Sequence, residues 1–329
     1  MVDPTKQSRC PQLRKLIFRL GAIIGSLIFL LVAIEIGLHL TGHFLIKTIA
    51  LDTAANPDAP SGFLAACFGD SVTYGPIDTT LRSYSYPAQL ERLLRREHPT
   101  LGVRVLNEGI CGANSADVIE RLKSRLAAYT RAPDLLIVMA GTNDMWNLHA
   151  ATPLKNGSAS LPAGKQWLAK LETTRVGKLS AMLGLRGAAL VNRLLETKGE
   201  GEQSRNWQTE DSRYVCVLHP ELPEERPFLE TWLRQDLAEI RRIGDAAGIP
   251  ILIGLYHLSQ MNPLIREAAT QAGLPVCDPP GHGDAYWKMT GLLSSDGWHP
   301  NEKGYAVIAR HFAACFESLA LIRNAAEKK

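Results

Sequence analysis

The sequence predicts an α/β domain on a doubly wound parallel sheet, preceded by an N-terminal transmembrane helix. Short apolar runs alternate with helical patterns along most of the chain, and turns rich in Gly, Asn, Asp and Ser follow the runs. Strands that alternate with helices in this way are typically parallel and joined by crossover helices. A long apolar stretch near the N-terminus predicts the membrane helix.

Each expected strand is a short apolar run bounded by turn residues. The runs are GFLAACF at 62–68, GVRVLN at 102–107, DLLIVMA at 134–140 and PILIGLY at 250–256. Apolar residues at helical spacing predict helices at 85–97, 115–129, 227–247, 261–272 and 302–322.

The apolar stretch LGAIIGSLIFLLVAIEIGLHL, residues 20–40, has the length that a helix needs to cross a bilayer. Its thirteen Leu, Ile, Val and Phe residues each contribute roughly −0.3 to −0.6 kcal/mol, which together outweighs a cost of roughly 3 kcal/mol for Glu35. Basic residues precede the stretch and few follow it, so we expect the N-terminus in the cytoplasm and the domain outside it. A cleaved signal peptide and a buried core helix are the alternatives.

We therefore divide the chain into three parts. Residues 1–43 form the cytoplasmic N-terminus and anchor, 44–60 a linker, and 61–329 the folded domain. Within the domain, about 149–225 is too long for an ordinary strand-to-helix connection and predicts a mostly helical insertion. Its stretch 165–198 carries seven Lys or Arg against two Glu, which fits a solvated insertion, a lid, or a basic face held against anionic headgroups.

Composition is that of a globular protein, with 46% hydrophobic and 21% charged residues and a formal net charge of +3. No basic block interleaved with aromatics occurs, so we expect no nucleic-acid partner. The cysteines show no C-x-x-C spacing and indicate neither a zinc site nor a disulfide framework, although one bridge stays open. They are Cys10, Cys67, Cys111, Cys216, Cys277 and Cys315.

Polar residues that could take part in catalysis follow the apolar runs. Parallel sheets bind ligands at these strand ends. Ser71 follows the first run, 109–114 the second and 141–144 the third. A serine nucleophile needs a base, and that base needs an orienting acid. The chain contains a single Asp-x-x-His, formed by Asp296 and His299 just before the last helix, and it supplies both.

An acyl-transfer site also needs donors to the oxyanion. The Asn143 side chain and the Gly112 backbone are candidates, although both also suit ordinary turns. His257 and His282 either line the cleft or hydrogen-bond within loops. Trp146 and Trp298, beside the candidate residues, wall the substrate pocket or pack in the core.

Four segments together resemble the sequence blocks of the SGNH (GDSL) hydrolases, in the family's order. They are FGDSVTYG, NEGICGANS, AGTNDMW and DGWHPNEKGYAVIA, and the resemblance covers roughly 62–148 and 227–325. It implies a flavodoxin-like, three-layer α/β/α fold. Asp70 matches the acid before the family's serine, for which the resemblance implies a structural role.

The resemblance also implies a role for each candidate. Ser71 is the nucleophile, His299 the general base and acid, and Asp296 the residue that orients it. The backbone N–H of Ser71, Gly112 and Asn143 form the oxyanion hole. No metal or other cofactor is implied.

The sequence thus predicts a membrane-anchored serine hydrolase that cleaves a carboxylic ester through an acyl-enzyme. The substrate is a small-molecule or envelope ester, either lipid acyl or carbohydrate O-acetyl. Two alternatives stay open: an O-acyltransferase that acts on an envelope polysaccharide, and a non-catalytic envelope-binding module. The sequence gives no prediction of oligomeric state.

Overall fold

A computed structural model describes most of the domain and part of the N-terminal segment. The described residues are 62–76, 82–145, 147, 218–278 and 284–318, with much of 15–37. The N-terminal segment belongs to a separate unit from the α/β domain and is described by itself.

The domain is built on one five-stranded sheet in which all pairings are parallel. Its strands are β1 (Leu64–Gly69), β2 (Arg104–Gly109), β3 (Leu135–Met139), β4 (Ile251–Gly254) and β5 (Val276–Cys277). Their order, β2-β1-β3-β4-β5, is the flavodoxin-like order, with a switch point beside β1 where the winding reverses. The predicted doubly wound fold is confirmed.

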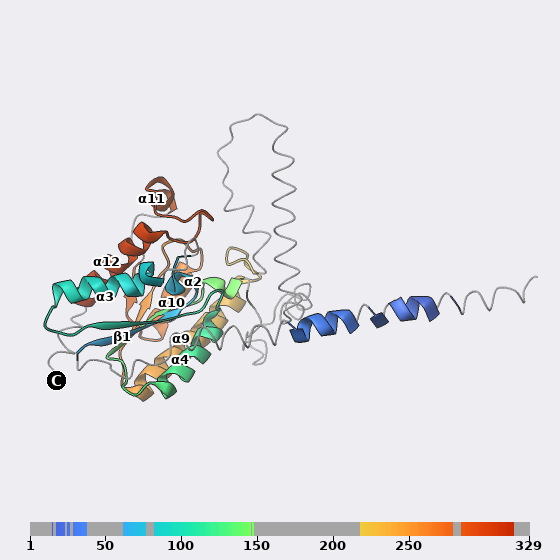
Figure 1. Ribbon diagram of the computed structural model, residues 1–329, viewed down its shortest axis with the longest axis horizontal. Coiled ribbons are helices and arrows are strands. Elements are labelled where there is room, and N and C mark those ends of the chain that lie inside the picture. Colours follow the sequence, from blue (N-terminus) through green and yellow to red (C-terminus); the bar gives the residue numbers. More distant parts are fainter. Residues whose placement is uncertain are drawn as a thin grey trace, which may run out of the picture. The chain divides into compact units, whose positions relative to one another are not determined.

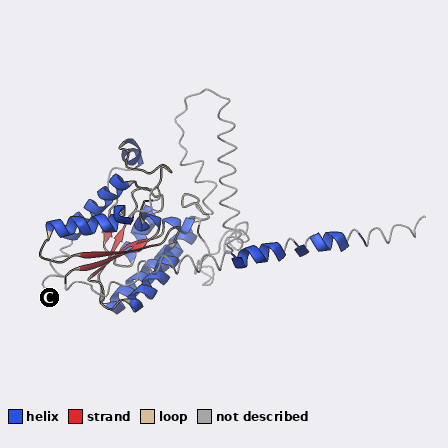
Figure 2. Cartoon of the chain, viewed as in Figure 1, coloured by secondary structure: helices blue, strands red, loops and turns tan. Residues whose placement is uncertain are grey.

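Helices cover both faces of the sheet (Figures 1 and 2). On one face, α3 (Tyr86–Glu97) packs against α12 (Glu302–Ser318). On the other lie α4 (Ser115–Ala128), α9 (Arg226–Ala247) and α10 (Asn262–Gln271). Shorter elements are α2 (Ser71–Tyr74), α11 (Asp284–Met289) and the 3₁₀ helices η2 (Arg82–Tyr84) and η3 (Thr142–Met145).

Burial on both faces explains why β1 and β3 read as unbroken apolar runs. Every residue of β1 and of β3 is buried, as expected for a parallel sheet sandwiched between helices. On one face the rings of Tyr86 and Phe312 stack with centroids 5.1 Å apart. On the other, Trp232 of α9 is fully buried.

Helix ends follow local signals in the sequence. Asn114 and Asp117 form a capping box at the start of α4. Gly248, in the left-handed conformation with φ 66°, ends α9. The observed strands and long helices lie within a few residues of the predicted ranges, whereas β5 and α11, of two and six residues, are too short to carry a periodic pattern.

The N-terminal segment is helical at 18–23, 25–26 and 29–37, and large apolar side chains such as Phe18 and Phe29 are exposed on it. Across the described parts of the chain, every helix falls short of the length and apolarity needed to cross a membrane. Several residues of the predicted span 20–40, and all of the linker 44–60, lie outside the described residues. The membrane anchor therefore stays a prediction.

The insertion predicted at 149–225 also lies largely outside the described residues, which resume at Leu218. There the chain rejoins the site region, because the Leu218 N–H donates to the Met145 carbonyl at 2.8 Å. The predicted domain boundaries stay predictions.

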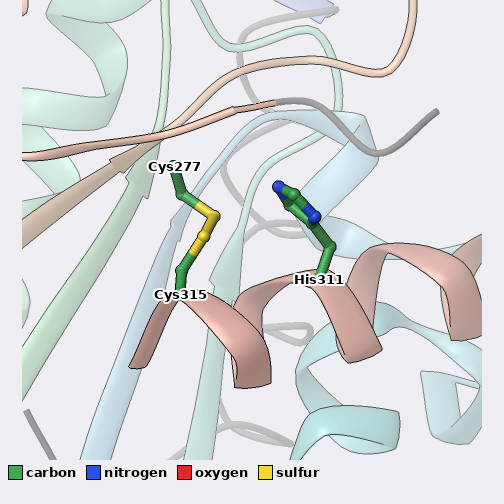
Figure 3. A group of neighbouring side chains, drawn as sticks. All are labelled: Cys277, His311 and Cys315. Atoms are coloured by element: carbon green, nitrogen blue, oxygen red, sulfur yellow. A yellow bond between two sulfur atoms is a disulfide. The ribbon is translucent and has the colours of Figure 1, made fainter. Parts of the chain in front are cut away.

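A disulfide joins Cys277 of β5 to Cys315 of α12, with the His311 ring beside it (Figure 3). It ties an edge strand to the helix that follows the Asp-x-x-His loop. Cys67 is a buried thiol and Cys111 an exposed one. Spacing in the sequence could not select this pair, because only the fold brings the two residues together.

We expect the disulfide to stabilise the domain measurably. It closes a loop with a sequence separation of 38, for which the chain-entropy model gives about 3 to 4 kcal/mol. Replacing both Cys277 and Cys315 with Ser should lower the free energy of unfolding by about that amount in urea titrations. Cys111→Ser, at an exposed thiol, is the control. Equal unfolding midpoints for the double variant and the control would contradict the expectation.

Candidate active site

Ser71 is the first residue of α2, directly after β1. The Asp70 carboxylate caps this helix, accepting from the Val72 N–H at 2.9 Å. The helix rests on Gly109 at the end of β2, where a Cβ would lie 2.2 Å from the Tyr74 nitrogen. Only glycine fits there, so the end of β2 fixes the height of Ser71 above the sheet.

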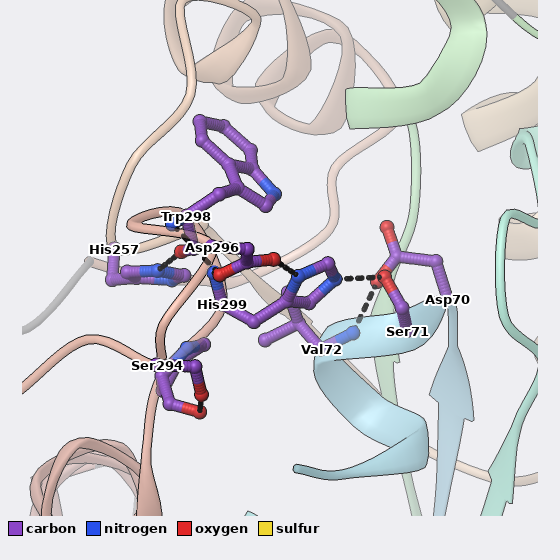
Figure 4. A network of polar contacts seen from close by, with 9 residues as sticks. Asp70, Ser71, Val72, His257, Ser294, Asp296, Trp298 and His299 are labelled. Atoms are coloured by element: carbon purple, nitrogen blue, oxygen red, sulfur yellow. Dashed lines mark hydrogen bonds and ion pairs between the residues drawn. The ribbon is translucent and has the colours of Figure 1, made fainter. Parts of the chain in front are cut away.

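The structure brings the predicted serine, histidine and aspartate into one hydrogen-bonded chain (Figure 4). His299 Nε2 lies 2.8 Å from Ser71 Oγ. His299 Nδ1 lies 2.5 Å from Asp296 Oδ2. The other oxygen of Asp296 accepts from the backbone N–H groups of Trp298 and His299, both at 3.0 Å.

Local hydrogen bonds hold the Asp-x-x-His loop in this shape. Gly297 takes φ 68°, which turns the chain back within the motif. The Ser294 N–H donates to the His299 carbonyl at 2.7 Å, and its hydroxyl donates to the Pro300 carbonyl at 2.9 Å. Asn301 directly precedes α12, and its side chain accepts from the Gly304 N–H and donates to loop carbonyls.

Asp296 is suited to pair with a charged imidazole. Partial burial acts to raise its pKa, but hydrogen bonds from the His299 ring and the two backbone N–H groups outweigh burial, so the pKa is lowered. The carboxyl group is therefore ionised and accepts the Nδ1 proton of His299. This fixes the tautomer that leaves Nε2 facing Ser71 as a proton acceptor.

The three predicted oxyanion donors follow β1, β2 and β3, neighbouring parallel strands that end at the same edge of the sheet. Ser71 opens α2, where a backbone N–H has no intrahelical acceptor. Gly112 takes φ 73°, and its N–H is used by no hydrogen bond among the described residues. The Asn143 amide donates to the Ala113 carbonyl at 2.9 Å and, over a long 3.3 Å, to Asp70.

Asn147 is a structural residue that the sequence analysis missed. Its side chain donates to the Gly112 carbonyl at 2.7 Å, and its own carbonyl accepts from Asn114 at 2.6 Å. It thereby fixes the peptide plane on one side of Gly112. Its position just after AGTNDMW was the available signal, since polar residues beyond a strand end share the same rim.

A comparison with protein families matches residues 67–307 to the GDSL-like lipase/acylhydrolase family. The chain belongs to this family. The resemblance predicted from the four segments is thus confirmed, and with it membership of a family of ester-hydrolysing enzymes.

Individual relatives of this GDSL-family chain are distant. An acetylxylan esterase from Geobacillus stearothermophilus is 38% identical over 61 residues, which are 18% of this chain and 27% of the esterase. The match thus spans about a quarter of that relative's length.

Among solved structures, the lipase/acylhydrolase from Enterococcus faecalis has a TM-score of 0.42 and 15% identity, covering 78% of this chain and 96% of its own. A two-domain esterase active on acetylated mannans has a TM-score of 0.42 and 12% identity, covering 85% of this chain and 52% of its own.

Asp70 is fully buried beneath the GDSL serine. Its pKa is raised to about 6, chiefly because burial disfavours the charge, while hydrogen bonds from Val72 and Tyr256 and the charge of His299 act in the opposite direction. Asp70 is not in the Ser71–His299–Asp296 chain. The structural role implied for it agrees with its contacts.

The remaining candidates are one buried histidine, one partly buried tryptophan and two residues outside the described part of the chain. His257 is 4% exposed and does not line an open cleft. Trp298 is partly buried against the core. His282 and Trp146 lie outside the described residues.

Two groups in the described part of the chain have metal-ligand atoms within 4.8 Å of one another, and neither includes a predicted site residue. One is Cys277, His311 and Cys315, whose two sulfurs are joined as the disulfide. The other is Glu97, His98 and Glu317 near the ends of α3 and α12.

Two buried acids, Asp144 and Asp236, share the Ser115 hydroxyl at the start of α4. Ser115 Oγ lies 2.7 Å from Asp144 Oδ2 and 2.6 Å from Asp236 Oδ2. A hydroxyl has one hydrogen, so the second contact requires a proton on a carboxyl group. Burial raises the pKa of Asp144 to about 7, and it also raises that of Asp236.

This arrangement predicts that the contribution of Asp144 to stability falls as pH rises. Because the folded-state pKa of Asp144 lies above its ordinary value of 3.8, its contribution is complete below about pH 4 and is lost as pH rises through about 7. In Asp144→Asn the amide N–H replaces the carboxyl proton, so the fall in unfolding free energy between these pH values should shrink. Urea titrations at several pH values measure it.

The matched control for this prediction is Asp245→Asn, at an exposed residue of α9 that pairs with Arg241. It should keep the wild-type pH dependence. An Asp144→Asn slope between pH 4 and pH 7 equal to that of the wild type would contradict the shared-proton interpretation.

Proposed function

We propose that the chain hydrolyses a carboxylic ester through an acyl-enzyme on Ser71. The observation that carries the proposal is the hydrogen-bonded chain from Ser71 Oγ through His299 to Asp296, at 2.8 and 2.5 Å. Membership of the GDSL-like lipase/acylhydrolase family supports the same reaction class. These three groups occur in the order that a nucleophile, its base and the orienting acid require.

In the first step Ser71 Oγ attacks the ester carbonyl carbon while His299 Nε2 takes the hydroxyl proton. The imidazolium that forms is stabilised by the ionised Asp296 against Nδ1. The carbonyl oxygen becomes the oxyanion of a tetrahedral intermediate. Its collapse releases the alcohol, which takes the proton back from Nε2, and leaves the acyl group on Ser71.

Three donors are available to the oxyanion. They are the N–H groups of Ser71 and Gly112 and the Asn143 amide, whose long 3.3 Å bond to Asp70 is weak enough to be exchanged for an oxyanion. In the second step His299 takes a proton from water, the hydroxide oxygen attacks the acyl carbon, and the acid leaves as Ser71 regains its proton.

For the substrate we propose an acetyl ester of a carbohydrate. The support is the local similarity to a protein named as an acetylxylan esterase. Lipid acyl esters are the competing class, and acyl chain length separates the two.

Replacing Ser71 with Ala should lower kcat by roughly 10³-fold or more, because triad members act as a unit. Acid release from an acetylated oligosaccharide and from matched esters of longer acids is the measurement, with acetate expected to be released fastest. Ser124→Ala, at an exposed serine of α4, is the control and should retain activity. A fluorophosphonate should label the wild type and Ser124→Ala but not Ser71→Ala.

Full turnover by purified Ser71→Ala would refute the serine mechanism. Transfer of the acyl group to a sugar acceptor in preference to water would favour the transferase alternative. Absence of both labelling and turnover in the wild type would favour the binding module.

We also propose that residues 20–40 anchor the chain in a membrane, with the domain on the extracytoplasmic side. The basic residues before this stretch and its apolar composition support the orientation. The Cys277–Cys315 disulfide adds support, because disulfides persist mainly in oxidising compartments.

Thiol labelling tests this orientation. Cys111 is an exposed thiol of the domain, so a membrane-impermeant maleimide should label it in intact spheroplasts expressing a Cys216→Ser variant of the full chain. Adding Cys111→Ser should abolish labelling until detergent is added, since Cys10 is expected in the cytoplasm. Labelling of Cys111 only after lysis would reverse the proposed orientation.

A further inference from the structure

We propose that Tyr256 and His257, consecutive residues just after β4, are positioning residues that hold the two sides of the site around Ser71. Tyr256 acts on the oxyanion donor Asn143 through Asp70. His257 acts on the 296–299 loop, which carries Asp296 and His299, through the Trp298 carbonyl. The proposal rests on the proposed function, since it assigns these residues to the same reaction. Neither residue belongs to the four segments that carry the family resemblance.

Tyr256 is fully buried and its hydroxyl donates to Asp70 Oδ2 at 2.8 Å. The same oxygen accepts from the Asn143 amide, while Asp70 Oδ1 caps the helix that carries Ser71. One carboxylate therefore links the serine, an oxyanion donor and Tyr256. The Tyr256 backbone is itself clamped by two hydrogen bonds to the Asn262 side chain, at 2.8 and 3.0 Å.

His257 Nε2 lies 2.8 Å from the Trp298 carbonyl (Figure 4). A carbonyl only accepts, so Nε2 carries the proton in this contact. The bond holds the peptide that joins Trp298 to His299, which also donates its N–H to Asp296. Any loosening here changes the orientation of the His299 ring toward Ser71.

The surroundings keep His257 neutral and in place. Burial lowers its pKa to about 4, and the charges that face it are those of His299, which acts to lower the pKa, and Asp296, which acts to raise it. Its ring lies 4.6 Å from the Trp287 ring of α11 and 6.2 Å from that of Trp298, measured between centroids. Its Nδ1 is buried without a partner among the described residues.

Tyr256 has no regular secondary structure and the chain bends at His257, so the two consecutive side chains contact different parts of the site. This explains how one short stretch after β4 reaches both Asp70 and the 296–299 loop. An unpaired Nδ1 at a buried position is costly for a residue that only fills space, because leucine or phenylalanine would fill it without that cost. The Nε2 hydrogen bond is what distinguishes histidine here.

The test for His257 compares His257→Phe, which keeps a ring but removes the donor, with His257→Gln, whose amide nitrogen can reach the place of Nε2. We expect His257→Phe to lower kcat roughly 10- to 100-fold with little change in KM, since small misplacements of catalytic groups have effects of this size. His257→Gln should recover most of the loss. The rate of fluorophosphonate labelling should follow kcat.

The far-downfield proton resonance of His299 Nδ1 reports the same contact spectroscopically. We expect it in the wild type, because the bond to Asp296 is short, and expect it to broaden in His257→Phe. His311→Phe is the control. It removes a histidine whose pKa is also lowered by burial, and whose Nε2 has no partner in the described part of the chain.

The test for Tyr256 is Tyr256→Phe, matched by Tyr305→Phe. Tyr305 is also fully buried, but its hydroxyl has no partner among the described residues. Tyr256→Phe should lower kcat roughly 10-fold, because Tyr256 acts on the oxyanion donor Asn143 only through Asp70. It should weaken binding of a boronic acid, which forms a tetrahedral adduct with serine, by the same factor, while Tyr305→Phe changes neither.

Activities are compared per folded molecule, with folding checked by urea titration. Wild-type labelling and turnover together with unchanged kcat in His257→Phe and Tyr256→Phe would overturn the positioning proposal and leave the proposed function standing. A loss in His257→Phe that His257→Gln does not recover, without any change in the His299 resonance, would also overturn it. A wild type that neither labels nor turns over would instead count against the proposed function.

Discussion

The arrangement of the site depends on the Asp70 carboxylate, which is buried where β1 ends. A buried carboxylate must have its oxygens satisfied by donors, or its burial costs several kcal/mol by the usual order of magnitude. Here the donors are the Val72 N–H, the Tyr256 hydroxyl and the Asn143 amide. They come from α2, from the segment after β4 and from η3, so satisfying one charge draws three separate segments toward Ser71. This explains why an acid that stands outside the serine–histidine–aspartate chain directly precedes the serine.

Strand order determines which segments can meet in this way. In the order β2-β1-β3-β4-β5, β1 has β2 on one side and β3 on the other. Because the three strands are parallel, the turns that follow them lie at the same edge of the sheet. Ser71, Gly112 and Asn143 follow these strands in turn. The fourth strand adds Tyr256 and His257, and the loop before α12 brings His299 across a sequence separation of 228 residues. The hydrogen bond between His299 and Ser71 therefore joins the turn after β1 to the loop before α12.

Most of the sheet and the site could be predicted from the sequence, because both depend on residue patterns that are local in the chain. Strands β1 and β3 are unbroken apolar runs, since they are buried on both faces, and Ser71, Gly112, Asn143, Asp296 and His299 each stand at a turn beside a strand or helix. The parts it could not indicate depend on distant contacts. β5 has two residues, Cys277 meets Cys315 only after α12 packs on the sheet, and the Asn147 side chain is drawn to Gly112 by a loop conformation. His257 was noted as a loop hydrogen-bonder or a cleft residue, and its partner, a backbone carbonyl, has no sequence signature.

The division of charge among the aspartates near Ser71 follows from how each is solvated by the protein. Burial raises the pKa of Asp70, Asp144 and Asp236, and these three accept hydrogen bonds that fix the serine turn, Asn143 and the start of α4. Asp296 is only partly buried and accepts three hydrogen bonds from its own loop, so it alone of the four has a lowered pKa. The acid against the imidazole is therefore the one that holds its charge most firmly. An imidazolium formed during acyl transfer then has a fixed anion at Nδ1, while the other three acids lie outside the chain that moves the proton.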